Sequence, residues 1–298
     1  MRHSELTSTP RLAGMSDAQE PSPSVLQVSV VVPVYRGEDT LPGLMAELSA
    51  LHVPQATPAG RLFQVSEVLL VWDRGPGRSD EVIRELAQEY DWIRPVWLSR
   101  NFGQHAATLA GMTSSGGDWI VTLDEDGQMD PAFIGAMLDT AYENSAQLVY
   151  AKPTNPPPHG AIRNAGSKLA KSIFVKFLAD QQFEEFNSFR LVQGEVGRSV
   201  AAYTGTGVYL DVALSWVVAS VATCPVTMRA EGRPKGGYNY SRLFGHFGRL
   251  VISSGTKPLM FVTFIGIAFV ILGAIAALWV LFQAIFGSVP VSGWASMF

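Results

Sequence analysis

The sequence has little charge and almost no cysteine. Only 16% of its 298 residues are charged, whereas soluble globular proteins carry about 25%. This composition excludes a uniformly soluble, a disordered or a fibrous protein. The single cysteine, Cys224, excludes an internal disulfide framework and a cysteine-cluster zinc site, and it permits a cytoplasmic environment. A formal net charge of −4 argues against a nucleic-acid binder, so we expect no nucleic-acid partner.

Charge is entirely missing from residues 258–298. Within them, residues 259–286 are apolar except for Thr263 and Gln283, and about 20 apolar residues suffice to cross a bilayer. We therefore predict a transmembrane helix over 258–287 rather than the buried core helix that is the alternative. The chain turns apolar again near Trp294, so residues 288–298 are consistent with the start of a second span.

The positions of the basic residues predict the orientation of this span. Arg242, Arg249 and Lys257 precede it, and no charged residue follows it. The positive-inside rule then places the large N-terminal region in the cytoplasm, at the cell membrane.

The rest of the chain divides into a tail and one domain. Residues 1–24 lack an apolar run, so we expect a disordered tail rather than a signal peptide. Residues 25–256 fit one domain by length. Apolar runs predict strands over 28–34, 67–72, 93–98 and 119–123, and helical spacing predicts helices over 40–51, 79–90 and 102–112 and from Pro131. This alternation predicts an α/β fold with a doubly wound, mostly parallel sheet.

Ligands bind such sheets beyond the carboxyl ends of the strands. The loop after the fourth predicted strand reads Asp124-Glu125-Asp126-Gly127-Gln128. In an extended segment Asp124, Asp126 and Gln128 would project to one side. Their oxygens would suit Mg²⁺ or Mn²⁺, with diphosphate oxygens completing the coordination. A solvated acidic turn is the alternative.

The other loops carry weaker signals. The loop after the second predicted strand contains Asp73 and an incomplete dinucleotide-binding fingerprint, so we interpret Asp73 as an acceptor for a nucleoside group. His105 has no partner at metal-binding spacing, which favours a solvated or satisfied histidine.

Two basic stretches complete the pattern. Residues 163–178 combine an apolar stripe with a cationic face, which predicts a helix on an anionic membrane surface; an ordinary surface helix packed on the sheet is the alternative. Residues 229–240 carry Arg and Lys among glycines, and such residues suit phosphate oxygens. Together with the acidic loop and the apolar segment, they point to a sugar nucleotide that meets a phosphate-bearing lipid at a bilayer.

Six motifs in order carry a resemblance to a known family. They are VVPVYRGEDTLPGL at 31–44, VWDRG at 71–75, LSRNFGQHAATLAGM at 98–112, DEDGQMDP at 124–131, FRL at 189–191 and RPKGGYNYSRL at 233–243. The chain thereby resembles the family-2 glycosyltransferases of the dolichol-phosphate mannose synthase and polyprenyl-phosphate glycosyltransferase group over about residues 28–286. It departs from the family pattern at Trp72, Arg74, Ser188 and Asn239.

The resemblance implies a GT-A fold and an inverting transfer of a sugar to an undecaprenyl or dolichyl phosphate. The residues that it implies are, for the donor, Pro33, Tyr35, Glu38, Asp73, Asp124 and Glu125; for the metal, Asp124, Asp126 and Gln128; for the acceptor phosphate, Arg190, Arg233 and Lys235. Asp124, Asp126 and Arg190 would be the catalytic residues. Within the domain 25–256 we expect interfacial helices at about 163–178 and 240–254.

The remaining partners stay open at this point. The donor is UDP- or GDP-linked, the membrane is a partner, and the chain acts alone or as a homo-oligomer. A processive polysaccharide synthase on a similar fold and a noncatalytic membrane-bound protein that binds nucleotide sugars are the alternative functions.

Overall fold

The computed structural model describes residues 24–155, 187–205, 207–229 and 257–286. Several predicted features lie outside these residues: almost all of the tail 1–24, the helix 163–178, the segment 240–254, the chain end 288–298, and Arg233 and Lys235. These features stay predictions.

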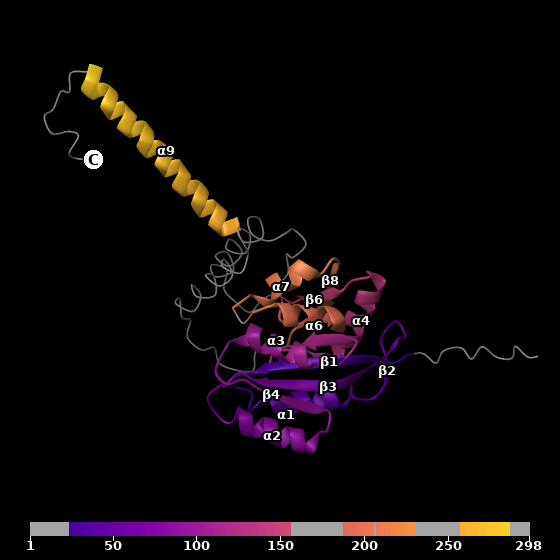
Figure 1. Ribbon diagram of the computed structural model, residues 1–298. Helices are drawn as coiled ribbons and strands as arrows, with labels where there is room; N and C mark the ends of the chain where they lie inside the picture. Colours follow the sequence, from indigo (N-terminus) through magenta and orange to yellow (C-terminus); the bar gives the residue numbers. More distant parts are fainter. Residues whose placement is uncertain (1–23, 156–186, 206, 230–256, 287–298) are drawn as a thin grey trace, which may run out of the picture.

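One eight-stranded sheet organises the domain (Figure 1). The strands are β1 Leu26–Val34, β2 Gln55–Ala56, β3 Leu62–Trp72, β4 Ile93–Trp97, β5 Trp119–Thr122, β6 Leu148–Pro153, β7 Arg190–Gln193 and β8 Val221–Val226. β3 pairs with β4 and β1, and β1 pairs with β5, all in parallel, as predicted. β7 runs antiparallel between β5 and β6, and the short β2 is antiparallel to β3. The whole sheet is therefore mixed, and its parallel pairs join β1, β3, β4 and β5 and also β6 and β8.

Helices cover both faces of the sheet. They are α1 Leu41–Ser49, α2 Ser79–Glu89, α3 Gln104–Ser114, α4 Ile134–Glu143 after a 3₁₀ turn at Pro131–Phe133, α6 Gly194–Tyr203 and α7 Leu210–Val217. Successive side chains of a strand point to opposite faces. Val30 and Val32 accordingly belong to the core shared with α1, α2 and α4, whereas Val31 belongs to the core shared with α3, α6 and α7. Figure 1 shows α1 and α2 on one side of the sheet and α3, α6 and α7 on the other.

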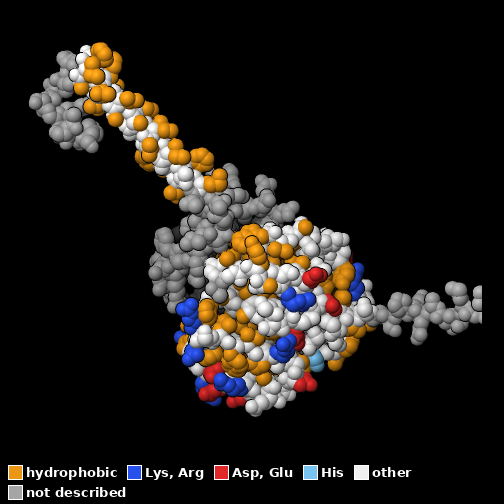
Figure 2. All heavy atoms as spheres, viewed as in Figure 1, with side chains coloured by type: hydrophobic (Ala, Val, Ile, Leu, Met, Phe, Trp, Pro, Cys, Tyr) orange, Lys and Arg blue, Asp and Glu red, His pale blue; other side chains and the backbone are white. Residues whose placement is uncertain are grey.

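The apolar segment near the end of the chain forms the helix α9, Lys257–Phe286, and its crossing of a membrane stays a prediction. Its apolar side chains, such as Phe269, Val270 and Leu278, are exposed (Figure 2). Residues 262–286 are long and apolar enough to cross a membrane. Exposed apolar surfaces of this size are typical of contact sites for a membrane or for another protein.

The topology brings the functional loops to one edge. The carboxyl ends of the parallel strands β1, β3, β4 and β5 lie together there. Because β7 is antiparallel, its first residue, Arg190, pairs with Thr122 at the carboxyl end of β5. The loop after β5 and the FRL motif therefore meet at this edge.

Candidate active site

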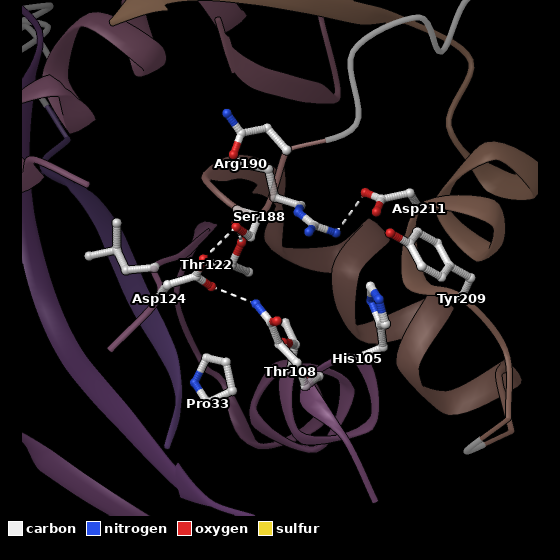
Figure 3. A pocket seen from close by; sticks show the side chains of 12 residues that line it. Pro33, His105, Thr108, Thr122, Asp124, Ser188, Arg190, Tyr209 and Asp211 are labelled. Carbon is white, nitrogen blue, oxygen red and sulfur yellow. Dashed lines mark hydrogen bonds and ion pairs between the residues drawn. The ribbon is translucent and has the colours of Figure 1, made fainter. Parts of the chain in front are cut away.

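A pocket of about 230 Å³ opens at this edge (Figure 3). Its walls come from the ends of β1, β5 and β7, the first turns of α3 and the start of α7. Its lining residues are Pro33, Gln104, His105, Thr108, Thr122, Leu123, Asp124, Asn187, Ser188, Arg190, Tyr209 and Asp211. Three residues predicted from the sequence, Pro33, Asp124 and Arg190, thus face one cavity.

The acidic loop after β5 turns instead of extending. Gly127 has φ of +72°, and residues 125–127 form a turn and a bend. Asp126 therefore accepts hydrogen bonds from the backbone N–H and the side-chain amide of Gln128, at 3.0 and 2.9 Å. The predicted alternation of three ligands along an extended segment is wrong, because a glycine in the left-handed region reverses the chain.

Asp124 has different partners. Its carboxylate accepts hydrogen bonds from the hydroxyl of Ser188 at 2.7 Å and from the amide of Gln104 at 2.5 Å. Burial raises the pKa of Asp124, and the charge of Asp126 adds to this effect, while the Ser188 hydrogen bond and the charge of Arg190 oppose it. A bound cation would offset the cost of keeping Asp124 ionised.

These residues fit a hard divalent cation in part. Within the part of the chain that the structure describes, no group of three or more His, Cys, Asp or Glu side chains could hold a metal ion. The carboxylates of Asp124 and Asp126 nevertheless offer oxygen ligands, and the Gln128 amide adds a third oxygen if it rotates so that its oxygen faces the cation. Mg²⁺ is commonly held by one or two carboxylates together with substrate phosphates, so the loop fits a cation shared with a diphosphate.

Glu125 fastens the loop after β5 to the loop after β1. Its carboxylate accepts hydrogen bonds from the backbone N–H groups of Tyr35 and Arg36, both at 2.9 Å. Glu38, from the same region of the chain, accepts a short hydrogen bond from the hydroxyl of Ser79. Of the predicted donor residues, Glu125 and Glu38 thus hold the β1 loop in place from two sides.

Asp73 fastens the loop after β4. It is 4% exposed, and its two oxygens accept hydrogen bonds from the backbone N–H groups of Phe102 and Gly103, at 2.7 and 2.8 Å. Burial raises the pKa of Asp73, and these two hydrogen bonds oppose the rise. The predicted acceptor for a nucleoside therefore uses both oxygens to hold the segment that begins α3 and carries Gln104 and His105 into the pocket.

Gly75 lets two of these loops touch. A β-carbon on Gly75 would lie 1.6 Å from the carbonyl oxygen of Tyr35. The G-x-G sequence after β3, which the sequence suggested as part of a weak fingerprint, thus serves backbone packing at this glycine.

Arg190 forms an ion pair that sequence reasoning missed. Its Nη1 lies 2.7 Å from Oδ1 of Asp211, and the two side chains are 4% and 3% exposed. The Tyr150 hydroxyl donates a hydrogen bond of 2.8 Å to the same oxygen. The sequence signal was available, because Asp211 interrupts the apolar stretch of α7.

His105 packs its ring against Tyr209, with centroids 4.0 Å apart, which favours the prediction of a satisfied histidine.

Arg229 joins the end of β8 to the acidic loop. Its backbone N–H donates to the carbonyl oxygen of Gln128 at 2.9 Å, and its guanidinium pairs with Glu47 and Asp130 at 2.8 and 3.0 Å. The chain therefore leaves the described part of the domain beside the acidic loop, four residues before Arg233.

Comparisons with known proteins agree with this architecture. Residues 29–202 match the sequence model of Glycosyl transferase family 2. A bactoprenol glucosyl transferase of Shigella phage SfX is 24% identical over 91% of this chain and 87% of its own. An undecaprenyl-phosphate 4-deoxy-4-formamido-L-arabinose transferase of Photorhabdus laumondii is 24% identical over 89% of this chain and 79% of its own.

Solved structures share the fold at low sequence identity. Glucosyl-3-phosphoglycerate synthase from Mycobacterium tuberculosis, in complex with Mn²⁺, UDP and phosphoglyceric acid, superposes with a TM-score of 0.50 at 17% identity, over 77% of this chain and 79% of that one. The chain covers 59% of the Staphylococcus aureus TarS 1–349 structure. The likeness to the synthase shows a GT-A-type α/β fold.

Proposed function

The chain belongs to glycosyl transferase family 2, and we propose that it transfers a sugar from a nucleotide-linked donor to a polyprenyl phosphate at the cytoplasmic face of a membrane. It is an enzyme of that family. The acceptor, the membrane and its cytoplasmic face are the proposed parts. One relative's name specifies undecaprenyl phosphate and another's specifies bactoprenol.

The observation that carries the proposal is the pairing of opposite charges in one pocket. Asp124 lines one side and Arg190 lies across from it (Figure 3). A carboxylate beside a divalent cation suits the donor diphosphate, and a guanidinium suits the oxygens of an acceptor phosphate. A transferase between a nucleotide sugar and a lipid phosphate needs both.

The donor would lie along the loops of the carboxyl edge. Pro33 lies near the end of β1, and Tyr35, Glu38 and Asp73 belong to the loops after β1 and β3. We assign the nucleoside to these four residues. The structural neighbour with bound UDP supports a nucleoside diphosphate, and the choice between UDP and GDP is left to experiment. Glu125 would act by holding the Tyr35 backbone in place.

Asp124, Asp126 and Gln128 would hold Mg²⁺ or Mn²⁺. When bound, the cation would neutralise charge that develops on the leaving diphosphate. The neighbour that binds Mn²⁺ together with UDP supports this assignment.

The transfer needs positioning more than proton removal. A phosphate monoester has a second pKa of about 6, so near neutral pH it is mostly a dianion. One of its oxygens attacks the anomeric carbon, the bond from that carbon to the diphosphate oxygen breaks, and the nucleoside diphosphate leaves with inversion. Arg190 would orient the attacking phosphate, with Arg233 and Lys235 assigned to the same task.

The membrane has a role in this scheme because the acceptor is a lipid. The candidate span at 262–286 and the basic residues before it support an anchored domain on the cytoplasmic side. The predicted surface helices near 163–178 and 240–254 would bring the pocket to the lipid headgroups.

The test uses the full chain purified in detergent, with Mg²⁺ and a panel of UDP- and GDP-sugars. Undecaprenyl phosphate should accept the sugar, and undecaprenol, which lacks the phosphate, should not. Equal transfer to both lipids would contradict the role given to Arg190. Growth of a polymer would favour the processive synthase, and nucleotide-sugar binding without turnover would favour the noncatalytic alternative.

A further inference from the structure

The ion pair between Arg190 and Asp211 is unusual in its burial. Removing two charges from water costs more than their attraction returns unless further hydrogen bonds stabilise them. The Tyr150 hydroxyl supplies such a bond to Asp211 at 2.8 Å. Three polar side chains from β6, β7 and α7 thus meet beside the pocket, and two of them, Arg190 and Asp211, line it.

The guanidinium of Arg190 keeps unused donor capacity. Its Nε is buried and has no hydrogen-bond partner among the described residues. A guanidinium presents five donors in a planar fork that matches phosphate oxygens. A buried donor without a partner lowers stability. The free Nε therefore suggests that an anionic ligand accepts its hydrogen bond when the pocket is occupied.

Arg190 has two carboxylates within electrostatic reach. Asp124 lies on the far side of Ser188, and the positive charge of Arg190 lowers the pKa of that aspartate. In Figure 3 the guanidinium points to Asp211 and away from Asp124. Without the charge of Asp211, Asp124 would be the carboxylate left in the pocket to attract it.

We propose that Asp211, held by Tyr150, is a positioning residue that keeps Arg190 away from Asp124, so that Asp124 stays available to a divalent cation while Arg190 faces a phosphate. This inference rests on the proposed function for the identity of the phosphate. The effect on the cation follows from the chain's own charges.

The experiment compares the full-length wild type with Asp211→Asn, which removes the charge and keeps the shape. Mn²⁺ affinity is measured by electron paramagnetic resonance without nucleotide or lipid. The KM for undecaprenyl phosphate, the KM for the donor and kcat are measured separately. We expect Asp211→Asn to weaken Mn²⁺ binding and to raise the lipid KM, each by about tenfold, within the usual range for energetic coupling between sites. The donor KM should stay within about twofold.

A matched control separates positioning from stability. Asp139 is 6% exposed and pairs with Arg61 at 2.8 Å, but it does not line the pocket. Asp139→Asn should lower the unfolding temperature and leave Mn²⁺ affinity and the lipid KM unchanged. Tyr150→Phe keeps the ion pair and removes one hydrogen bond, so it should weaken Mn²⁺ binding and raise the lipid KM by about threefold each. This variant replaces Asp211→Asn as the test if Asp211→Asn does not fold.

Two results would overturn the inference. One is an Asp211→Asn protein with wild-type Mn²⁺ affinity, whatever its unfolding temperature. The other is a fall in kcat of ~10³-fold at unchanged lipid KM, which is the scale of losing a proton acceptor. Because Mn²⁺ binding is measured without lipid, it decides the inference even if the wild type transfers no sugar to a lipid, the result that would refute the proposed function.

Discussion

Gly75 offers a sharp test of how the donor loops are built. In Gly75→Ala the new β-carbon would lie 1.6 Å from the carbonyl oxygen of Tyr35 and 2.5 Å from its carbonyl carbon. Carbon and oxygen normally approach to about 3.3 Å at closest, so the two loops would have to separate by about 1.7 Å. The obstacle is backbone, and no side-chain rotation can relieve it.

The cost follows from this displacement. Overpacking of this kind costs about 1–3 kcal/mol of stability, and a misplacement of about 1 Å near a site can cost ~10²-fold in rate. We expect Gly75→Ala to lower kcat/KM for the nucleotide sugar by ~10²-fold, because Tyr35 and Asp73 flank the contact. Thermal unfolding and donor kinetics on the same preparation measure the two effects.

Gly43 supplies the matched control. It lies inside α1, and a β-carbon there would meet nothing within 4 Å. Gly43→Ala should stabilise the protein by about 0.5–1 kcal/mol, as alanine does in helices, and leave the donor kinetics unchanged. Wild-type donor kinetics in Gly75→Ala would refute the proposed contact between the loops.

Three further predictions concern the metal loop, an ion pair at the opposite edge of the sheet and the histidines. Asp126→Ala should lower transfer by ~10²–10³-fold at saturating Mg²⁺; near-normal activity in a folded variant would show that the metal assignment is wrong. Burial raises the pKa of Glu67, but its hydrogen bonds and the charge of Arg94 lower that pKa more, so that it lies below the usual 4.5. The ionised Glu67 therefore stabilises the fold fully above pH 4.5, and this stabilisation is lost as the pH falls through the lowered pKa. Glu67→Gln should therefore cost about 1–3 kcal/mol near neutral pH, by urea unfolding, and progressively less in acid; a pH-independent loss would contradict this reasoning. His105→Ala should keep most activity in transfer assays, and so should His159→Ala, which changes a histidine of the proline-rich stretch 155–160, outside the described residues. A ~10³-fold loss in either would indicate a general base.

The sequence predicted the parallel half of the fold because long stretches of its central strands are buried. Strands such as β1, with seven consecutive buried residues, appear as unbroken apolar runs. β7 has only four residues, too few for a pattern, and its antiparallel direction depends on pairing with β5 and β6. Local periodicity in the sequence therefore could not predict that the sheet is mixed.

The candidate site divides in the same way. Asp124 and Arg190 stand in motifs, and the structure brings both to one pocket. Asp211 and Tyr150 come from distant segments and become neighbours only through the packing of α7 against the sheet. Asp73 was identified by its loop, but its two backbone partners lie 29 and 30 residues away, and no spacing rule predicts them.

In the proposed reaction one sugar passes from a nucleotide to a lipid phosphate. The most direct measurement is mass spectrometry of the lipid product made by the purified full chain with Mg²⁺, a nucleotide sugar and undecaprenyl phosphate. We expect a lipid whose mass increases by one sugar residue, with one nucleoside diphosphate released for each lipid modified. Free sugar from donor hydrolysis with unmodified lipid, or a lipid that carries a growing polymer, would contradict it.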